Sequence, residues 1–343
     1  MIKTITSLDN CLLACVSSDG LSLYIWYIPT STIKYQFLNC HQSRIKNLLK
    51  LDNFKLATGS NDGVIKVWDL SHGALFCTFD DTNGGHLAAV NAMAKLDYGL
   101  FVSASSDSNI KIWNLNRHEL KCTFNFRESN HNSLINAIVA LDYGLIAIAY
   151  ENSSIKIWDI NKNSLKYSLE GEDGHQKSVR QLIKCDYGVL ASGSSDGKVK
   201  IWNVNRGLLI YDLEHSSEIK ALVKLDYGII ASADENSIKI WNIIRGTLNY
   251  SFENAHKQIV KSLVKLEYGL LASASSDSIK IWNTNLGNLQ YVLEENDLVD
   301  DVNSHKELAY LDNVLLASRS FNDDETKIWN VSKRLLVSTL NNS

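Results

Sequence analysis

Eight tryptophans constrain the fold of this chain more than any other feature. Segments around them repeat almost word for word: LDYGLFVSASSDSNIKIWN covers 96–114 and LEYGLLASASSDSIKIWN covers 266–283. A period of about 43 residues is typical of a propeller or a solenoid, in which each repeat is one structural unit. The tryptophans stand 39 to 47 residues apart, at positions 26, 68, 113, 158, 202, 241, 282 and 329.

An acidic residue gives the repeats a finer frame. It opens the second half of each copy, at Asp9, Asp52, Asp97, Asp142, Asp186, Asp226, Glu267 and Asp312. A histidine stands eleven positions before six of these acidic anchors, at His41, His86, His131, His175, His215 and His256. A constant spacing over six copies indicates one local structure that is repeated.

Each copy reads as four strands. Short apolar or alternating runs such as GLLAS and IKIW are separated by Gly, Asp, Ser and Asn, and no apolar stripe has the period of a helix. A four-stranded sheet cannot bury both of its faces alone. Radial stacking of such sheets buries both faces, and closing the ring protects the edges.

These residues make the sequence resemble the WD-repeat family, whose blades carry a histidine, a Ser/Thr, a turn aspartate and a terminal Trp-Asp. The dipeptide itself is kept only at Trp68–Asp69 and Trp158–Asp159. The resemblance covers essentially all of the chain and implies a β-propeller. Counting copies predicts an all-β, eight-bladed propeller of four-stranded antiparallel blades in a single domain, 1–343. Seven blades plus one irregular repeat is the alternative.

Four copies contain a set that imitates a hydrolase triad. An active site occurs once, however, whereas this set recurs, and in the resembling family these residues form a buried hydrogen-bond chain from the indole to the aspartate. We therefore predict a structural role and no catalytic residue. Blade six has Asn236 at the aspartate position, and blade four has Ile148 and Asn152 in place of the serine and aspartate. The complete sets are His41, Thr58, Asp62 and Trp68; His86, Ser103, Asp107 and Trp113; His175, Ser192, Asp196 and Trp202; and His256, Ser273, Asp277 and Trp282.

The residue six before each anchor is the candidate ligand position. It begins the innermost strand, where members of the resembling family contact partners, and six of the eight are cationic. We expect a positive crescent at one mouth of the channel, partly neutralised by Glu218, Glu235 and the acidic loop 294–301. A second lysine set, two before the tryptophans, is expected to hold its ammonium groups in water. The crescent positions are Lys3, Lys46, Asn91, Asn136, Arg180, Lys220, Lys261 and Lys306, with Arg44 beside Lys46.

Composition excludes several classes of function. The chain has 34 Lys and Arg against 38 Asp and Glu, a net charge of −4, so a nucleic-acid partner is not expected. The six cysteines show neither metal-site nor redox spacing, so we predict no metal and no cofactor and expect a reducing compartment, cytoplasmic or nuclear. No apolar run is long enough to span a bilayer.

Three functions remain for a chain of this kind. The leading hypothesis is a non-enzymatic scaffold that presents protein- or peptide-binding surfaces and assembles a multiprotein complex. The alternative is a reader of anionic ligands, such as phosphopeptides, acidic motifs or phosphoinositide headgroups, through the Lys/Arg crescent. The third, an enzyme, would need a unique cluster of titratable groups, and the sequence shows only repeated ones.

Overall fold

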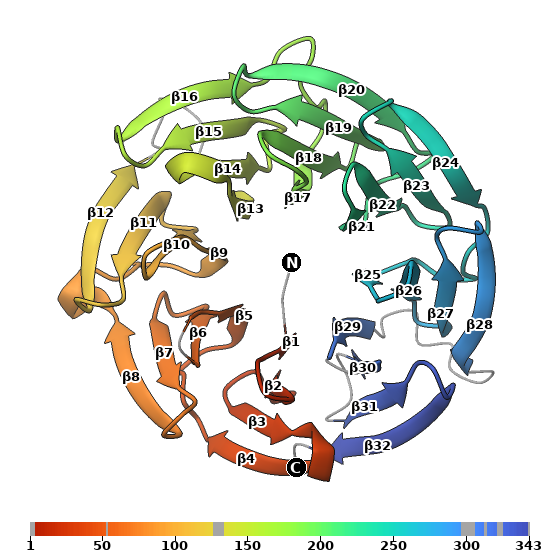
Figure 1. Ribbon diagram of the computed structural model, residues 1–343. Coiled ribbons are helices and arrows are strands. Elements are labelled where there is room, and N and C mark those ends of the chain that lie inside the picture. The colour runs from red at the N-terminus through yellow and green to blue at the C-terminus, as the bar shows by residue number, and fades with distance from the viewer. Residues whose placement is uncertain are drawn as a thin grey trace. The chain divides into compact units, whose positions relative to one another are not determined.

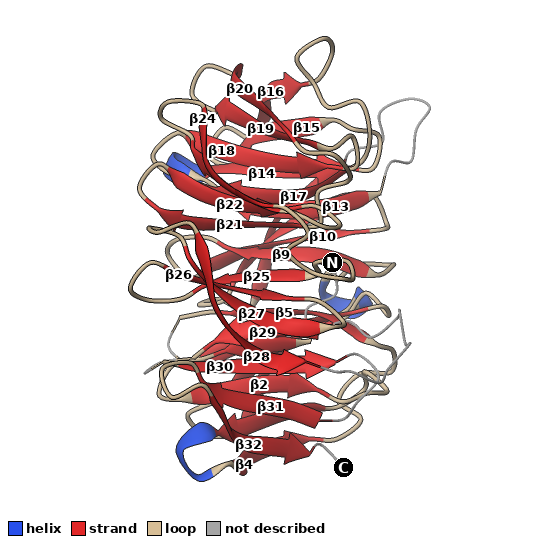
Figure 2. Ribbon diagram, turned by 90° about the vertical axis from the view of Figure 1, so that its right-hand side faces the viewer, coloured by secondary structure: helices blue, strands red, loops and turns tan. Residues whose placement is uncertain are grey.

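Strands make up nearly all of the regular structure (Figure 2). The structure is a computed structural model that describes residues 4–52, 54–125, 134–295, 306–311, 314–320 and 325–341. Within these ranges the helical elements are three 3-10 turns, and none is long and apolar enough to span a membrane. The turns are η1 (Ile28–Thr30), η2 (Asp81–Asn83) and η3 (Asp142–Gly144).

The strands pair as four-stranded antiparallel sheets, each built from four strands that are consecutive in the chain (Figure 1). The sheets are numbered here as blades one to eight in chain order. By its internal contacts the chain divides into two compact units. One unit comprises Met1–Ile28 and Ile33–Leu182, and the other comprises Pro29–Thr32 and Ile183–Ser343.

The first unit holds blades one to four. Blade one has β1 (Ile5–Ser7), β2 (Leu12–Val16), β3 (Leu23–Tyr27) and β4 (Thr32–Phe37). Blade two has β5 (Ile45–Lys50), β6 (Lys55–Ser60), β7 (Ile65–Asp69) and β8 (Ala74–Phe79). Blade three has β9 (Val90–Lys95), β10 (Leu100–Ser105), β11 (Asn109–Asn114) and β12 (Glu119–Asn125). Blade four has β13 (Ile135–Ala140), β14 (Leu145–Tyr150), β15 (Ile155–Asp159) and β16 (Ser164–Leu169).

The second unit holds most of blade five and blades six to eight. Blade five has β17 (Val179–Lys184), β18 (Val189–Ser194), β19 (Lys198–Asn203) and β20 (Leu208–Glu214). Blade six has β21 (Ala221–Asp226), β22 (Ile229–Ala233), β23 (Ile238–Asn242) and β24 (Thr247–Phe252). Blade seven has β25 (Ser262–Lys265), β26 (Leu270–Ala274), β27 (Ser278–Asn283) and β28 (Asn288–Glu295). Blade eight has β29 (Lys306–Tyr310), β30 (Leu315–Ser320), β31 (Glu325–Asn330) and β32 (Leu335–Asn341).

The blade count confirms the predicted fold class, an all-β propeller of eight four-stranded antiparallel blades. The seven-bladed alternative is wrong, because the first and the last repeat each form a sheet of their own. Blade one takes all four strands from the start of the sequence and blade eight takes all four from its end, so neither combines strands from both. The prediction that residues 1–343 form one domain stays a prediction.

The apolar core lies between neighbouring blades. In the first unit, Val102 and Ile112 of blade three pack in one cluster with Ile146 and Ile148 of blade four, and all four side chains are fully buried. In the second unit, one cluster likewise joins residues of blades six and seven. Blade three also packs against blade two, in a cluster that joins Phe101 and Trp113 to Phe79. Both faces of blade three are therefore covered by neighbouring blades, which explains why its second strand is apolar without the alternation of a half-exposed strand.

A β-bulge recurs at the tryptophan that ends the third strand. In blade three, Ile112 pairs with Cys122 but Trp113 pairs with Leu120, so the outermost strand carries one extra residue there. The same shift occurs at the tryptophans of blades two and four to eight. A bulge increases the local right-handed twist and bends the outer strand.

Strand direction sorts the connections of each blade between two edges. Successive strands alternate in direction, so the loop that enters a blade and the turn between its second and third strands lie at one edge. We call this the loop edge. The Asp-Tyr-Gly turns between first and second strands, and the turns after the tryptophans, lie at the opposite edge, which we call the turn edge. Tyr98 is one of several exposed tyrosines there, with 92% of its surface accessible.

The acidic anchors connect neighbouring blades at the turn edge. In blades two, three and six, the lysine two positions before the anchor donates its Nζ to the anchor of the preceding blade. Lys50 lies 2.6 Å from Asp9, Lys95 lies 2.5 Å from Asp52, and Lys224 lies 2.6 Å from Asp186. Asp186 Oδ2 also accepts a hydrogen bond of 2.8 Å from the Gly228 amide. The anchor is therefore an inter-blade contact as well as a turn residue.

Replacing Asp186 by Ala should lower the free energy of unfolding by about 1 to 2 kcal/mol, because one partly exposed ion pair and one backbone hydrogen bond are lost. Asp97→Ala is the matched control, since Asp97 is an exposed anchor. It should change the free energy by less than about 0.5 kcal/mol. Urea unfolding followed by tryptophan fluorescence measures both, and equal losses would contradict the inter-blade role.

Candidate functional site

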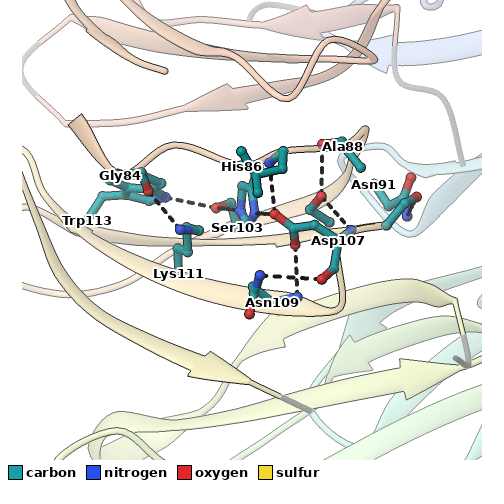
Figure 3. A network of polar contacts seen from close by, with 12 residues as sticks. Gly84, His86, Ala88, Asn91, Ser103, Asp107, Asn109, Lys111 and Trp113 are labelled. Atoms are coloured by element: carbon teal, nitrogen blue, oxygen red, sulfur yellow. Dashed lines mark hydrogen bonds and ion pairs between the residues drawn. The ribbon is translucent and has the colours of Figure 1, made fainter. Parts of the chain in front are cut away.

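Blade three shows the polar chain of the loop edge most completely (Figure 3). Trp113 Nε1 donates to Ser103 Oγ at 2.8 Å, and Ser103 Oγ lies 2.7 Å from His86 Nε2. The other imidazole nitrogen, Nδ1, lies 2.9 Å from Asp107 Oδ2. The tryptophan, serine and histidine are buried, and the Asp107 side chain keeps only 7% of its surface accessible.

The hydrogen bonds of this series all run in one direction, from the indole to the carboxylate. The indole N–H donates to the serine oxygen, the serine O–H donates to His86 Nε2, and His86 Nδ1–H donates to Asp107. Burial lowers the pKa of His86, and the Asp107 carboxylate offsets part of that effect. Burial acts to raise the pKa of Asp107, but the hydrogen bonds from His86 and from the Leu87 and Asn109 amides outweigh it and hold the pKa well below its usual range. At neutral pH the imidazole is neutral and the carboxylate ionised.

This arrangement does not suit catalysis. Ser103 is fully buried, and its oxygen and proton are both engaged by the chain. A nucleophilic serine needs an approach for the substrate and donors around the developing oxyanion. The chain instead fixes the loop that precedes the blade, because Asp107 also accepts a 3.0 Å hydrogen bond from the Leu87 amide.

Three other predicted sets are placed in the same way, with differences in detail. In blade seven His256 lies 2.7 Å from Ser273 and 3.1 Å from Asp277, and Trp282 donates to Ser273 at 2.8 Å. In blade five Trp202 donates to Ser192 at 2.8 Å, His175 is buried, and Asp196 accepts the Lys198 amide at 2.9 Å. In blade two His41 lies 2.7 Å from Thr58, and Trp68 donates to Thr58 at 3.1 Å, but His41 Nδ1 is 3.9 Å from Asp62.

Blade six completes its chain with a residue that sequence reasoning missed. His215 lies 2.6 Å from Ser232, and its Nδ1 lies 3.3 Å from Asp234 rather than near Asn236. Asp234 is fully buried, and the Ser237 amide and Ser216 hydroxyl donate to it at 2.6 and 2.9 Å. The signal was available: an acidic residue two positions after the serine lies on the same face of the strand. Blade four differs in that Ile148 has no side-chain acceptor, and His131 lies outside the described residues.

The lysines two before the tryptophans correct another expectation. Their ammonium groups were expected in water, but several donate to backbone carbonyls of the loop that precedes the blade. Lys111 is buried, and Lys66 and Lys280 are half-buried. Lys111 Nζ donates to Gly84 O at 2.7 Å, and Lys66 Nζ donates to Cys40 O at 2.6 Å. Lys280 does the same to Ala255 O at 2.7 Å. Each carbonyl stands one or two residues before the buried histidine, so the lysine is a second clamp on the same loop.

Only some of the residues of the predicted cationic crescent are exposed cations. Within the first unit, Lys46 Nζ lies 3.5 Å from Asn91 Oδ1, and Asn91 donates to Ser106 Oγ at 2.9 Å. Asn136 donates to Ser178 Oγ at 2.9 Å. Arg44 and Arg180 are exposed. Lys3 and the side chain of Lys306 lie outside the described residues.

Blades six and seven carry a mixed cluster of charges at the crescent. Lys220 Nζ lies 2.9 Å from Glu218 and 3.9 Å from Glu235. Burial lowers the pKa of Lys261, and the neighbouring Lys220 cation adds to that effect. The two lysines are thus close together, but the glutamates neutralise much of the positive potential predicted here.

Comparisons with known proteins agree with this architecture. The family model WD domain, G-beta repeat, matches residues 33–69, 77–114 and 164–203. No curated protein was found to match the chain. Among solved structures, the crystal structure of the computationally designed Ika8 protein is similar, with a TM-score of 0.79 and 24% identity over 96% of this chain and 97% of that one. At that identity the likeness speaks for the fold alone.

Replacing Asp234 by Ala should lower the free energy of unfolding by about 2 to 3 kcal/mol, because His215 and the buried Ser237 amide lose their acceptor and the Ser216 hydroxyl loses a partner. Asn236→Ala, at the position where the repeat frame places the aspartate, is exposed and should cost less than about 0.5 kcal/mol. Chemical denaturation of both variants tests the assignment, and the reverse order of losses would overturn it.

The lowered pKa of His86 predicts a pH dependence of folding. Below pH 6.5, its ordinary pKa, the unfolded chain gains a proton that the folded chain resists, so the free energy of unfolding falls as the pH drops toward the folded pKa. His86→Gln removes this contribution, whereas His118→Gln changes an exposed ring. Denaturation between about pH 7.5 and pH 5 should give a smaller slope for His86→Gln than for wild type or His118→Gln. Equal slopes in all three proteins would contradict the prediction.

Proposed function

We propose that this WD-repeat protein is a non-enzymatic scaffold that binds proteins or peptides at the loop edge of its blades. One observation carries the proposal: a constant buried framework presents variable exposed residues. Each histidine of these hydrogen-bond chains is held in place in the described blades. The residue that follows it is exposed and varies between blades, with only glutamine occurring twice. These exposed residues are Gln42, Leu87, Gln176, Ser216 and Lys257.

A fixed position with a free choice of side chain is what a recognition surface requires. The histidine cannot change without breaking a buried hydrogen-bond chain. The side chains of Gln42, Leu87 and Lys257, in contrast, make no hydrogen bond within the described residues and use only their backbone amides. In blade three the backbone amide of Leu87 is bound by Asp107 while 79% of its surface stays accessible. Binding energy at protein interfaces is concentrated in a few such side chains that a rigid element holds in place.

The anionic-ligand alternative has weaker support. It needs cations without local partners, and at blade six Lys220 is already paired with Glu218 and approaches Glu235. Arg44 is exposed and is the cation of this set that an acidic segment would meet at blade two. Steep weakening of partner binding as ionic strength rises would favour this alternative over the general scaffold.

Charge reversal at the two edges tests the proposed surface. A partner is first identified by co-purification from native cells and then purified, so that its affinity is measured by calorimetry. Arg44→Glu with Lys257→Glu alters the loop edge, and Arg206→Glu with Arg245→Glu is a matched change of exposed arginines at the turn edge. We expect the first pair to weaken binding at least about tenfold and the second less than about twofold.

The opposite pattern would move the binding surface to the turn edge. Failure of any purified partner to bind directly would contradict the scaffold function itself. Unchanged melting temperatures in both double variants are the control for folding.

A further inference from the structure

A groove of about 580 Å³ lies at the loop edge between blades two and three, within the first unit. Its walls come from the second-to-third turn of blade two, from the histidine-bearing loops of both blades, and from the residues around η2. The groove is acidic: Asp62, Asp80 and Asp81 line it. Lys66 also lines it, but the Lys66 ammonium is engaged by Cys40 O at 2.6 Å.

The negative charge of the groove is not neutralised by its surroundings. Asp62 is held ionised by backbone donors, since its Oδ1 accepts the Val64 amide at 2.9 Å and its Oδ2 accepts the Gln42 amide at 3.2 Å. Asp81 is exposed, and Asp80 uses Oδ1 to accept from Thr82 at the start of η2. Three carboxylates therefore face one ammonium, and a cationic guest would gain from the difference.

His41 provides a second, independent observation at the groove, an unpaired buried polar atom. It lines the groove, only 4% of its surface is accessible, and its Nδ1 has no hydrogen-bond partner. The equivalent nitrogens of blades three and seven lie 2.9 and 3.1 Å from their aspartates, whereas His41 Nδ1 lies 3.9 Å from Asp62 Oδ2. That separation is beyond hydrogen-bonding distance.

The positions of the donated protons in blade two indicate which kind of ligand the groove can bind. Thr58 Oγ1 lies 3.3 Å from the Lys66 carbonyl, which can accept the hydroxyl proton. His41 Nε2–H then donates to Thr58 at 2.7 Å, and Nδ1 is left as an acceptor. Two acceptors, His41 Nδ1 and the Asp62 carboxylate, thus face each other without a shared proton. A donor group that enters the groove can bind the Asp62 carboxylate, which keeps 18% of its side-chain surface accessible, next to the unpaired His41 Nδ1.

The rim of the groove adds an apolar contact. Leu87 lines it and keeps 79% of its surface accessible, and Val64 contributes a second aliphatic wall. Long basic side chains combine an aliphatic stem with a charged donor head, so they match a groove with an apolar rim and a carboxylate floor. Arginine suits it best, because its planar guanidinium can donate two parallel hydrogen bonds to one carboxylate.

We propose that the groove between blades two and three binds an arginine side chain of a partner protein, with its guanidinium at Asp62 and Asp81 and its stem against Leu87. This inference rests on the proposed scaffold function in that the ligand belongs to a protein partner. It is distinct from the crescent, since the guest is a cation and the charge of the site is negative.

A small probe tests the groove without any partner. The probe is N-acetyl-leucyl-arginine amide, and N-acetyl-leucyl-citrulline amide is the neutral analogue of nearly the same shape. Binding to the full chain is titrated by saturation-transfer NMR. We expect the arginine probe to bind at least about tenfold more tightly than the citrulline probe, because the charge-assisted hydrogen bonds are lost in the analogue.

Variants place the binding in the groove. Asp81→Lys should weaken the arginine probe at least about tenfold, and Leu87→Ser about threefold, because each removes a contact that only the groove supplies. Asp97→Lys makes the same carboxylate-to-lysine change at an exposed turn-edge position and should stay within about twofold of wild type. Added probe should also shift the imidazole resonances of His41 and leave those of His86 in place.

Equal affinity for the two probes, no binding to the wild type, or wild-type affinity in Asp81→Lys would each overturn the proposal. A partner whose binding is unaffected by Asp81→Lys but lost on charge reversal elsewhere at the loop edge would also overturn it. That last result would leave the scaffold function standing, so the two failures are distinguishable.

Discussion

A buried hydroxyl between a tryptophan and a histidine is the contact on which each regular blade depends. In blades two, three, five, six and seven, a serine or threonine oxygen lies within 3.1 Å of the indole nitrogen of the blade's tryptophan. Each of these blades also has a histidine with a buried side chain, which in blades three and seven belongs to the same series of hydrogen bonds. A buried polar group left without a hydrogen-bond partner costs about 1 to 3 kcal/mol of stability. Loss of one residue of the hydrogen-bond chain therefore makes the remaining polar residues unfavourable. The histidine lies in the loop that enters the blade. The hydrogen bonds that pair the buried polar groups therefore also fix the position of the loop edge.

A second set of contacts fixes the loops from the other side. The ammonium groups of Lys111 and Lys280 donate to a carbonyl one or two residues before the histidine. The aspartate that ends the hydrogen-bond chain accepts the backbone amide of the residue just after the histidine. The loop is therefore clamped on both sides of the histidine while the following side chain points outward. This combination of rigid backbone and unconstrained side chain explains how one repeated unit can present different chemistry in each blade.

The fold followed from the sequence because period and spacing are properties of the chain alone. Eight tryptophans and eight acidic anchors define eight blades, and the sheet order agrees. The spacing of the repeats does not show in which direction each side chain points. A fixed offset from the anchor selected Asn236, although Asp234 is the residue that lies beside His215. The neutralisation expected from Glu218 and Glu235 is present at Lys220, at 2.9 and 3.9 Å. The acidic groove was missed because its carboxylates come from a turn and a following loop that no single repeat position defines.

Hydrogen exchange at the tryptophan indoles tests the central claim most directly, namely that the buried chain holds the loop edge as part of the global core. The account predicts that the Nε1–H protons of Trp113, Trp202, Trp241 and Trp282 exchange only through global unfolding. Their opening free energies, from two-dimensional NMR at neutral pH, should then equal the unfolding free energy from chemical denaturation. Exchange of these protons within minutes, well below that limit, would show that the chains open locally and would contradict the account.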